Sequence, residues 1–426
     1  MIDRHNYEKH SSSNLWMIYI IVFSIILIPD IRITSLPAFR VEQVIVVICA
    51  IFLYMKLMLR KKTGINRQNI RFPVLYLSFS FFIILSILVG SIKGIKVLPS
   101  DFFELYKIFI YLGIYLIILL TIKNEKDKLK ILKFTIFILL ISVAIATQQY
   151  FNLFNLNEKY VQIIAPTQFR TLVNNYPFPR VIGMTSNPNE YAVMPGIGAI
   201  LSWGLYLKTK EKKNILYMMV FIVGVLMTLS RSGFLFMSVG IIMFTFLYLF
   251  SSNISNFLKG NINLKAVKVV IFSVVFLITI GTIIFNFLPQ ELTWRLMRGI
   301  NIGTDSSFQA RLSNWEEHIV HFKSSPIFGL GPAKSIEYEH SVDNEWLLFL
   351  KRYGIVGTIY IVFIFIFPVI KSKRSFFKYL YLSILIGSAI YMIPSIIYNC
   401  FQIMPLIMIL AALVPDSKII KKINSS

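Results

Sequence analysis

Apolar runs of about twenty residues recur along the whole chain and alternate with short polar segments. A helix of about twenty residues crosses the hydrocarbon core of a bilayer and satisfies its own backbone hydrogen bonds there. The pattern therefore predicts an all-α polytopic membrane protein, with a single integral membrane domain over residues 1–426 and about twelve transmembrane helices. We expect these spans at 14–29, 42–59, 72–91, 102–122, 131–150, 190–207, 214–230, 233–250, 267–288, 344–370, 376–396 and 399–414.

The tenth expected span is interrupted by Lys351, Arg352 and Gly354. Charged residues at membrane depth are costly, and glycine weakens a helix. The first part of this span, from Asn344 to Leu350, therefore has two interpretations. It is the start of a true span, or it is an interfacial or re-entrant piece.

Composition and charge support the membrane assignment and orient it. The chain is 56% hydrophobic and only 15% charged, whereas a soluble domain carries roughly a quarter charged residues. Its net charge is +23, and most Lys and Arg fall in the N-terminal segment and in 56–71, 123–133, 208–213, 259–268, 371–378 and 418–422. These segments share one face of the predicted topology, which the positive-inside rule makes cytoplasmic, together with both termini. The basic charge is thus a topology signal, and we expect no nucleic-acid partner.

Two loops of the opposite, outer face are long, at about 151–189 and 289–343. Long loops in a compact protein commonly carry function. Cys49 and Cys400 lie in or beside apolar spans, so the cysteines suggest neither a disulfide nor a metal framework.

Three arginines in separate outer segments are candidate anion ligands. Arg231 lies in a tight break between two spans, Arg180 precedes a turn rich in Gly and Asn, and Arg311 opens a predicted outer helix. A guanidinium binds phosphate in a bidentate manner, so the three could converge on a lipid pyrophosphate. The alternative for Arg231 is a side chain that snorkels from a helix end.

Two further groups have a structural alternative. His318 and His321 have helical i,i+3 spacing, but without further ligands we interpret them as a solvated face of an amphipathic helix and expect no metal or cofactor. Asp101, Glu104 and Lys107 share one helix face near the outer end of the fourth span. They form either a structural ion pair or a functional site.

Candidates for a general base lie in or next to the second long outer loop. Glu337, Glu339, His340, Asp343 and Glu345 cluster there, and His or a carboxylate can take the proton of an acceptor hydroxyl. The alternative is an ordinary solvated loop of mixed charge.

Four segments in this order resemble the O-antigen ligase/polymerase superfamily, which contains the Wzy-type polysaccharide polymerases and the WaaL-type ligases. They are Arg180-x2-Gly183…Asn187-Pro188-Asn189, Ser230-Arg231-Ser232-Gly233, Arg311-x3-Trp315 with Pro326…Gly329-x-Gly331, and Asp343-Asn344…Gly354-x2-Gly357. The large outer loop between the ninth and tenth spans is also similar to that family.

The resemblance implies a metal-independent membrane glycosyltransferase in the bacterial inner membrane. Such an enzyme transfers glycan from an undecaprenyl pyrophosphate carrier at the outer face of the membrane, and a chain-length regulator is a plausible partner. By this resemblance Arg180 and Arg231 would clamp the pyrophosphate and Arg311 would assist. We also expect Asn344 to bind substrate.

One departure from the family pattern favours a polymerase. Ligases typically carry His-Asn where this chain has Asp343-Asn344, while His340 lies three residues upstream. The base is then His340, Asp343 or no dedicated residue. The alternatives are a WaaL-type ligase, a flippase or other secondary transporter, and a structural subunit; the chain shows no internal repeat of the kind common in transporters.

Overall fold

The computed structural model describes residues 15–29, 40–59, 67–165, 169, 172, 179–250, 275, 306–337 and 343–415. Within these ranges all regular structure is helical. The expected ninth span at 267–288 lies outside the described residues apart from position 275, and so does His340.

Every other expected span coincides with a helix. The long helices are α2 (Leu15–Leu27), α3 (Val41–Leu59), α4 (Arg67–Ile92), α5 (Phe103–Thr121), α6 (Glu125–Phe151), α9 (Pro188–Thr209), α10 (Lys213–Met227), α11 (Arg231–Phe250), α17 (Glu345–Lys371), α18 (Phe376–Tyr391) and α19 (Ile403–Leu413). Shorter elements are η2 (Pro99–Phe102), η3 (Leu153–Asn155), η4 (Asn157–Val161), α7 (Gln162–Ile164) and α16 (Lys334–Glu337), and α15 (Ser306–Ser324) is an amphipathic helix.

Five segments in the described part of the chain are long and apolar enough to cross a membrane: Arg71–Ile92, Pro99–Thr121, Glu125–Phe151, Arg231–Phe250 and Glu345–Lys371. Five further apolar helices there are shorter, among them α2, α10 and α19. The protein is therefore a multi-pass, all-helical membrane protein. The number of twelve spans and their orientation stay predictions.

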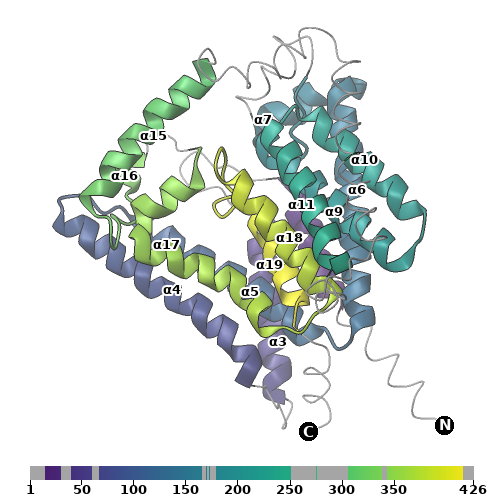
Figure 1. Ribbon diagram of the computed structural model, residues 1–426, viewed down its shortest axis with the longest axis horizontal. Coiled ribbons are helices and arrows are strands. Elements are labelled where there is room, and N and C mark those ends of the chain that lie inside the picture. Colours follow the sequence, from purple (N-terminus) through teal and green to yellow (C-terminus); the bar gives the residue numbers. More distant parts are fainter. Residues whose placement is uncertain are drawn as a thin grey trace, which may run out of the picture.

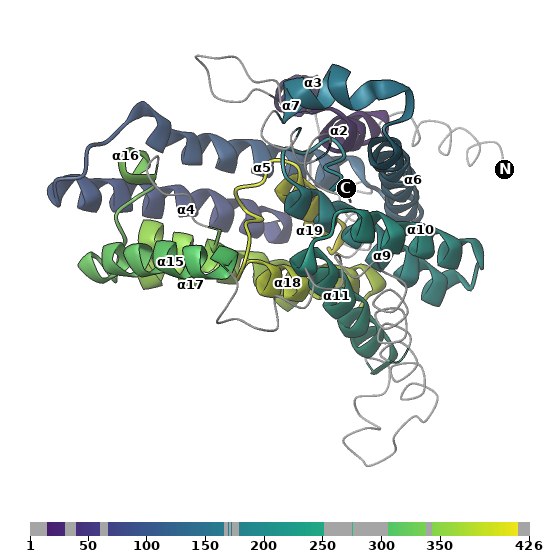
Figure 2. The ribbon, with the colours of Figure 1, turned by 90° about the horizontal axis from the view of Figure 1, so that it is seen from above.

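Helix α9 is the centre of one half of the bundle. It packs against α6, α10 and α11, and α11 packs in turn against α18 (Figure 1). Small residues on α9 allow this close packing, because the ring of Phe221 lies over Gly198 and that of Phe236 over Gly196. In the other half, α4 lies along α17, and α18 and α19 occupy the middle (Figure 2).

Lysines gather at one end of the helices, which we call the basic end. Lys208 forms an ion pair with Glu125 at 2.6 Å and lies over the ring of Phe376 at 4.7 Å. Lys128 donates to the carbonyl of Pro415. The turns before α6, after α9, before α18 and after α19 therefore meet there, as the clustering of positive charge predicts.

Candidate active site

The opposite end of the bundle, which we call the site end, carries the starts of α5, α9, α11 and α17. Its most irregular feature is a break in α17 at Gly354, where φ is +64° and ψ is −171°. Residues 345–353 thus form a short helical piece ahead of the break, and the choice between a true span and an interfacial or re-entrant piece stays a prediction. A side chain at position 354 would be strained, and its Cβ would lie 2.2 Å from the carbonyl oxygen of Ile327.

The segment 326–331 fills this break and satisfies its backbone. Leu330 N and Gly331 N donate to the carbonyls of Lys351 and Arg352 at 2.8 and 2.9 Å. In return, the N–H groups of residues 355 and 356 donate to the carbonyls of residues 326 and 327 at 2.8 and 3.2 Å. A helix can be interrupted at membrane depth only when its free backbone groups find such partners. The motif Pro326…Gly331 and the break that contains the motif Gly354…Gly357 are thus joined by backbone hydrogen bonds.

Arg352, two residues before the break, belongs to a buried network of charged side chains. Arg352 Nη1 lies 3.1 Å from Glu104 Oε1, and Lys107 Nζ lies 2.8 Å from the same oxygen. Asn399 Oδ1 accepts from both cations, at 3.1 and 2.7 Å. All three charged side chains are almost fully buried. Of the alternatives for Asp101, Glu104 and Lys107, the structure shows the ion pair, between Lys107 and Glu104, extended by Arg352.

Asp101 has a different role from its neighbours on the helix face. Its two carboxylate oxygens accept from Leu98 N at 2.7 Å and from Lys334 N at 2.8 Å. It therefore ties the start of the fourth expected span to α16.

Glu345 holds the irregular connection between α18 and α19, residues 392–402. Its buried carboxylate accepts from Ile397 N, from Tyr398 N at 2.8 Å, and from Asn399 N and Nδ2 at 3.0 and 2.9 Å. The expected spans continued through most of this segment. Pro394 lies in this segment and favours the interruption, because proline lacks the N–H of a helical hydrogen bond and its ring crowds the preceding turn.

The turn that carries Arg231 follows directly from its local sequence. Ser230 Oγ accepts from Gly233 N at 3.2 Å, so Ser230 caps α11 and Arg231 is its first residue. Gly233 lies against Ala192 of α9, where a Cβ would come within 2.2 Å of the alanine Cβ. Arg231 itself is solvent-exposed, at the positive end of the helix dipole.

Arg180 is joined to the same turn. Its Nε donates to the carbonyl of Thr228 at 2.9 Å, and its Nη2 donates to Asn189 Oδ1 at 3.0 Å. Asn187 caps α9 by accepting from Asn189 N at 2.8 Å, and Pro188 occupies the first helical position. The segments that carry Arg180 and Arg231 are therefore joined by hydrogen bonds, together with the starts of α9 and α11.

The connection 392–402 joins these segments to the buried charge network. The Tyr391 hydroxyl donates to the carbonyl of Asn189 at 2.7 Å, and Gln402 Nε2 donates to that of Met184 at 2.9 Å. Asn399, in the same connection, binds Lys107 and Arg352. Gln149 of α6 fixes the other side of the 180–189 segment by accepting from Ile182 N and Gly183 N.

The remaining predicted site residues form a second pair. Arg311 of α15 lies 3.3 Å from a carboxylate oxygen of Asp343, and Asp343 is about half exposed. Asn344 is buried and caps α17 by accepting from Leu347 N at 3.1 Å. His340 lies outside the described residues. The convergence of Arg180, Arg231 and Arg311 on one anion stays a prediction.

The interpretation of His318 as solvated is wrong. His318 is 2% exposed, whereas the side chain of His321 is 27% exposed and its Nε2 lies 3.9 Å from Glu317 Oε1. The physical reason is that α15 packs along α17, so one of its two histidines faces that helix. Burial lowers the pKa of His321, and the nearby cation Lys351 lowers it further.

Among the described residues no three His, Cys, Asp or Glu side chains are placed to hold a metal ion.

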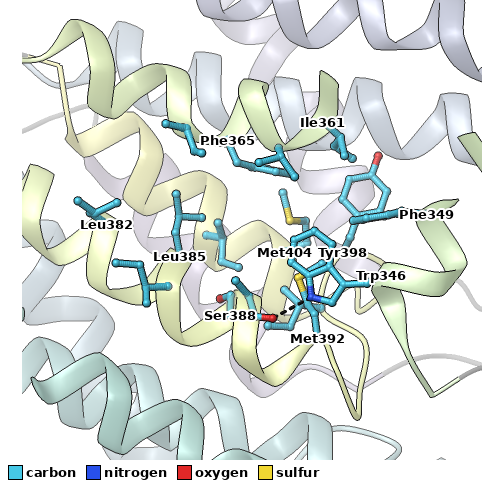
Figure 3. A pocket seen from close by; sticks show the side chains of 16 residues that line it. Trp346, Phe349, Ile361, Phe365, Leu382, Leu385, Ser388, Met392, Tyr398 and Met404 are labelled. Carbon is cyan, nitrogen blue, oxygen red and sulfur yellow. Dashed lines mark hydrogen bonds between the residues drawn. The ribbon is translucent and has the colours of Figure 1, made fainter. Parts of the chain in front are cut away.

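An apolar cavity of about 190 Å³ lies between α17 and α18, next to the connection 392–402 (Figure 3). Trp346, Met392 and Tyr398 line one end of it and Leu382 the other. Trp346 is fixed by a hydrogen bond from Nε1 to the carbonyl of Ala389, at 2.8 Å. The cavity therefore has the apolar lining that suits a hydrocarbon chain, and it begins at the site end.

Sequence reasoning missed the residues that hold these segments in place, namely Gln149, Asn399 and Gln402. The signal was available, because each is an amide side chain at the edge of an apolar run. What the sequence could not indicate was the partner of each amide.

Residues 216–362 match the family model described as O-antigen ligase. No curated protein matches the chain. The matched range contains Arg231, Arg311, Asp343 and Gly354, and ends beyond the break in α17. Arg180 and Glu104 lie outside the matched range and join it through the contacts described above.

Proposed function

We propose that this chain, whose residues 216–362 match the O-antigen ligase family model, is a member of the O-antigen ligase/polymerase superfamily and polymerises a surface polysaccharide. The growing glycan leaves its undecaprenyl pyrophosphate carrier and is joined to the next lipid-linked repeat unit. The reaction takes place at the outer face of the bacterial inner membrane, which corresponds to the site end of the bundle.

The shared turn of Arg180 and Arg231 is the observation that carries this proposal. Arg180 binds the carbonyl of Thr228, three residues before Arg231, and both arginines lie beside the capped starts of α9 and α11. Guanidinium groups and helix N-termini are the two protein features best suited to a phosphate anion. The site end therefore offers a place for a pyrophosphate at the depth of the lipid headgroups.

The proposed transfer breaks the bond between the anomeric carbon and the pyrophosphate oxygen and forms a bond from that carbon to an acceptor hydroxyl oxygen. Lipid pyrophosphate leaves with the electron pair, and its negative charge grows in the transition state. Arg180 and Arg231 stabilise that charge, because cations already in position act where charge develops in the transition state.

The proton of the acceptor hydroxyl goes to a base beside Arg311. We assign this role to Asp343, which is partly exposed and whose carboxylate Arg311 holds at 3.3 Å. His340, three residues upstream, is the second candidate. A carboxylate in place of the His-Asn pattern of ligases is the feature that favours a polymerase.

The apolar cavity between α17 and α18 supplies a seat for part of the prenyl chain. Its end near Trp346 and Tyr398 is next to the connection 392–402, which also binds the 180–189 segment. A lipid chain in this cavity would place its pyrophosphate at the site end.

The test is a reconstituted reaction with the purified full-length protein and a lipid-linked single repeat unit, with products separated on a gel. A ladder of longer lipid-linked chains, formed without nucleotide and in the presence of EDTA, supports the polymerase. Transfer only after lipid A core is added would make the protein a ligase. The identity of the cognate repeat unit is first verified with its native flippase and transferases. If neither product then forms, glycan transfer is contradicted and a transporter is favoured.

A further inference from the structure

A second cavity lies at the basic end, far from the residues assigned to transfer. It has a volume of about 150 Å³ and lies between α6 and α10. The three helices α6, α9 and α10 pack on one another, and Leu205 of α9 forms part of its wall. This groove has no role in the transfer proposed above.

The residues of α6 in this groove change from basic to apolar with depth. Lys133 lies two turns from the start of α6 at Glu125. Phe137 and Leu140 follow at the next turns of the same face, toward the middle of the helix. Phe137 is 56% exposed on the outside of the bundle. The groove therefore opens sideways along α6.

The residues of α10 repeat this order. Lys213 is the first residue of α10, and its neighbour Asn214 is buried, with its Nδ2 donating to Thr209 Oγ1 at 3.2 Å. Tyr217 lines the groove one turn deeper. Leu216, which precedes Tyr217 and lies outside the groove lining, is 63% exposed. Both walls thus place a cation nearer the basic end than the apolar residues that line the groove.

The turn between α9 and α10 adds further positive charge. It carries Lys208, Lys210, Lys212 and Lys213 against one acid, Glu211. Glu211 Oε2 lies 2.9 Å from Lys213 Nζ, so the carboxylate occupies one of the three donors of that ammonium group. The turn keeps an excess of cations at the mouth of the groove.

We infer that this groove is a binding site for an anionic phospholipid, with the headgroup phosphate between Lys133 and Lys213 and an acyl chain along Phe137 and Tyr217. The order of a cation followed by apolar surface along both helices, with the amide of Asn214 beside the cation on α10, matches the order of phosphate, glycerol and chain in such a lipid. Basic pockets between transmembrane helices at a positively charged face commonly bind anionic headgroups. A free phosphate would use the lysines but not the apolar walls.

Native mass spectrometry of the full-length protein in detergent tests the site, with titration of dioleoyl phosphatidylglycerol and of dioleoyl phosphatidylcholine. We expect one phosphatidylglycerol to bind at least about tenfold more tightly than phosphatidylcholine, and this preference to be lost in the double variant Lys133→Gln/Lys213→Gln. The matched control is Lys126→Gln/Lys130→Gln, which removes the same charge from α6 at two exposed positions outside the groove. It should keep the preference.

Three outcomes would overturn the inference. Equal affinity for the two lipids would mean that the groove does not select an anion. Equal loss in the two double variants would mean that diffuse surface charge, and not the groove, attracts the lipid. Displacement of phosphatidylglycerol by millimolar inorganic phosphate, with equal binding of dihexanoyl and dioleoyl chains, would make free phosphate the ligand. A thermal unfolding midpoint near that of the unmodified protein separates these results from misfolding.

Discussion

Two groups of cations lie at the site end, and their surroundings differ. Lys107 and Arg352 are buried and share the carboxylate of Glu104. Arg231 is exposed at the start of α11, and Arg311 is partly exposed beside Asp343. A buried charge must be neutralised by the protein itself, whereas an exposed charge at a helix end can be neutralised by a ligand. The comparison teaches that the first group holds the framework, and it makes the second group the one where we expect a substrate anion to bind.

The largest effect expected from this comparison is on stability. Arg352→Ala leaves Glu104 and Asn399 without one of their partners and should destabilise the protein by about 3–5 kcal/mol. Arg311→Ala removes a partly exposed ion pair and should change stability by less than about 1 kcal/mol. Thermal unfolding in detergent measures both. If the two variants unfold at the same temperature, the distinction between framework and ligand cations is wrong.

The next effect concerns activity with stability unchanged. Arg231→Ala should lower chain extension by about 10²–10³-fold, the typical loss when a fixed charge-stabilising group is removed. Arg231→Lys should recover part of the rate, since an ammonium group lacks the planar fork of guanidinium. Arg374→Ala is the control, because Arg374 is exposed at the basic end. Full activity of Arg231→Ala in the gel assay would remove Arg231 from the proposed site.

The break in α17 should be sensitive to a single methyl group. Gly354→Ala adds a strained conformation and a clash with the carbonyl of Ile327, so we expect a loss of about 1–3 kcal/mol or more. Gly94→Ala is a matched control, because φ is +83° there but no atom lies within 4 Å of the added Cβ. Its cost should be that of backbone strain alone, about 1 kcal/mol. Similar midpoints for the two variants would mean that the 326–331 segment moves aside freely.

A smaller effect separates the cap of α17 from substrate binding. Asn344→Ala should lose about 1 kcal/mol of stability, because the Leu347 N–H loses its acceptor. Asn344→Ser keeps a capping oxygen and should restore the midpoint. If chain extension stays low in the serine variant, Asn344 also contacts substrate; if it returns, capping accounts for the whole effect.

The smallest effect is a pH dependence from His321. Burial lowers its pKa in the folded protein, so below the ordinary value of about 6.5 the unfolded chain binds more protons. This contribution to stability is present above that pH and is lost as the pH falls. The unfolding midpoint should therefore drop slightly more between pH 7 and 5.5 in the unmodified protein than in His321→Gln. The opposite order would mean that Glu317 dominates over burial.

The parts of the fold that could be predicted are those set by local sequence. Apolar runs located the described helices, and the interruption at Lys351, Arg352 and Gly354 indicated the break in α17. The partners across the chain could not be predicted, because nothing near Glu104 indicates Arg352 and nothing near Glu345 indicates the N–H groups of 397–399. His318 was misplaced for the same reason, since its burial depends on a helix that begins 27 residues later.

For the candidate site, the sequence indicated which arginines to consider but not how they are held. Ser230 and Asn187 are recognisable helix caps, and their motifs have a local explanation in the structure. Arg180 meets the Arg231 turn through a backbone carbonyl, and any residue could supply that group. A contact between a side chain and a backbone carbonyl therefore cannot be predicted from a single sequence.

The exchange of backbone hydrogen bonds between 326–331 and the break in α17 also bears on how the protein is made. The hydrogen-bonded partners are about 20 to 30 residues apart along the chain, which is short compared with the links between α5 and α17. Residues 326–331 are synthesised first, so they are already present when the interrupted helix emerges. The outer piece of α17 can therefore find its backbone partners as soon as it enters the membrane, before α18 and α19 exist. We expect helix and loop to form one insertion unit, so that a variant that weakens the hydrogen bonds between them accumulates in the membrane at a lower level.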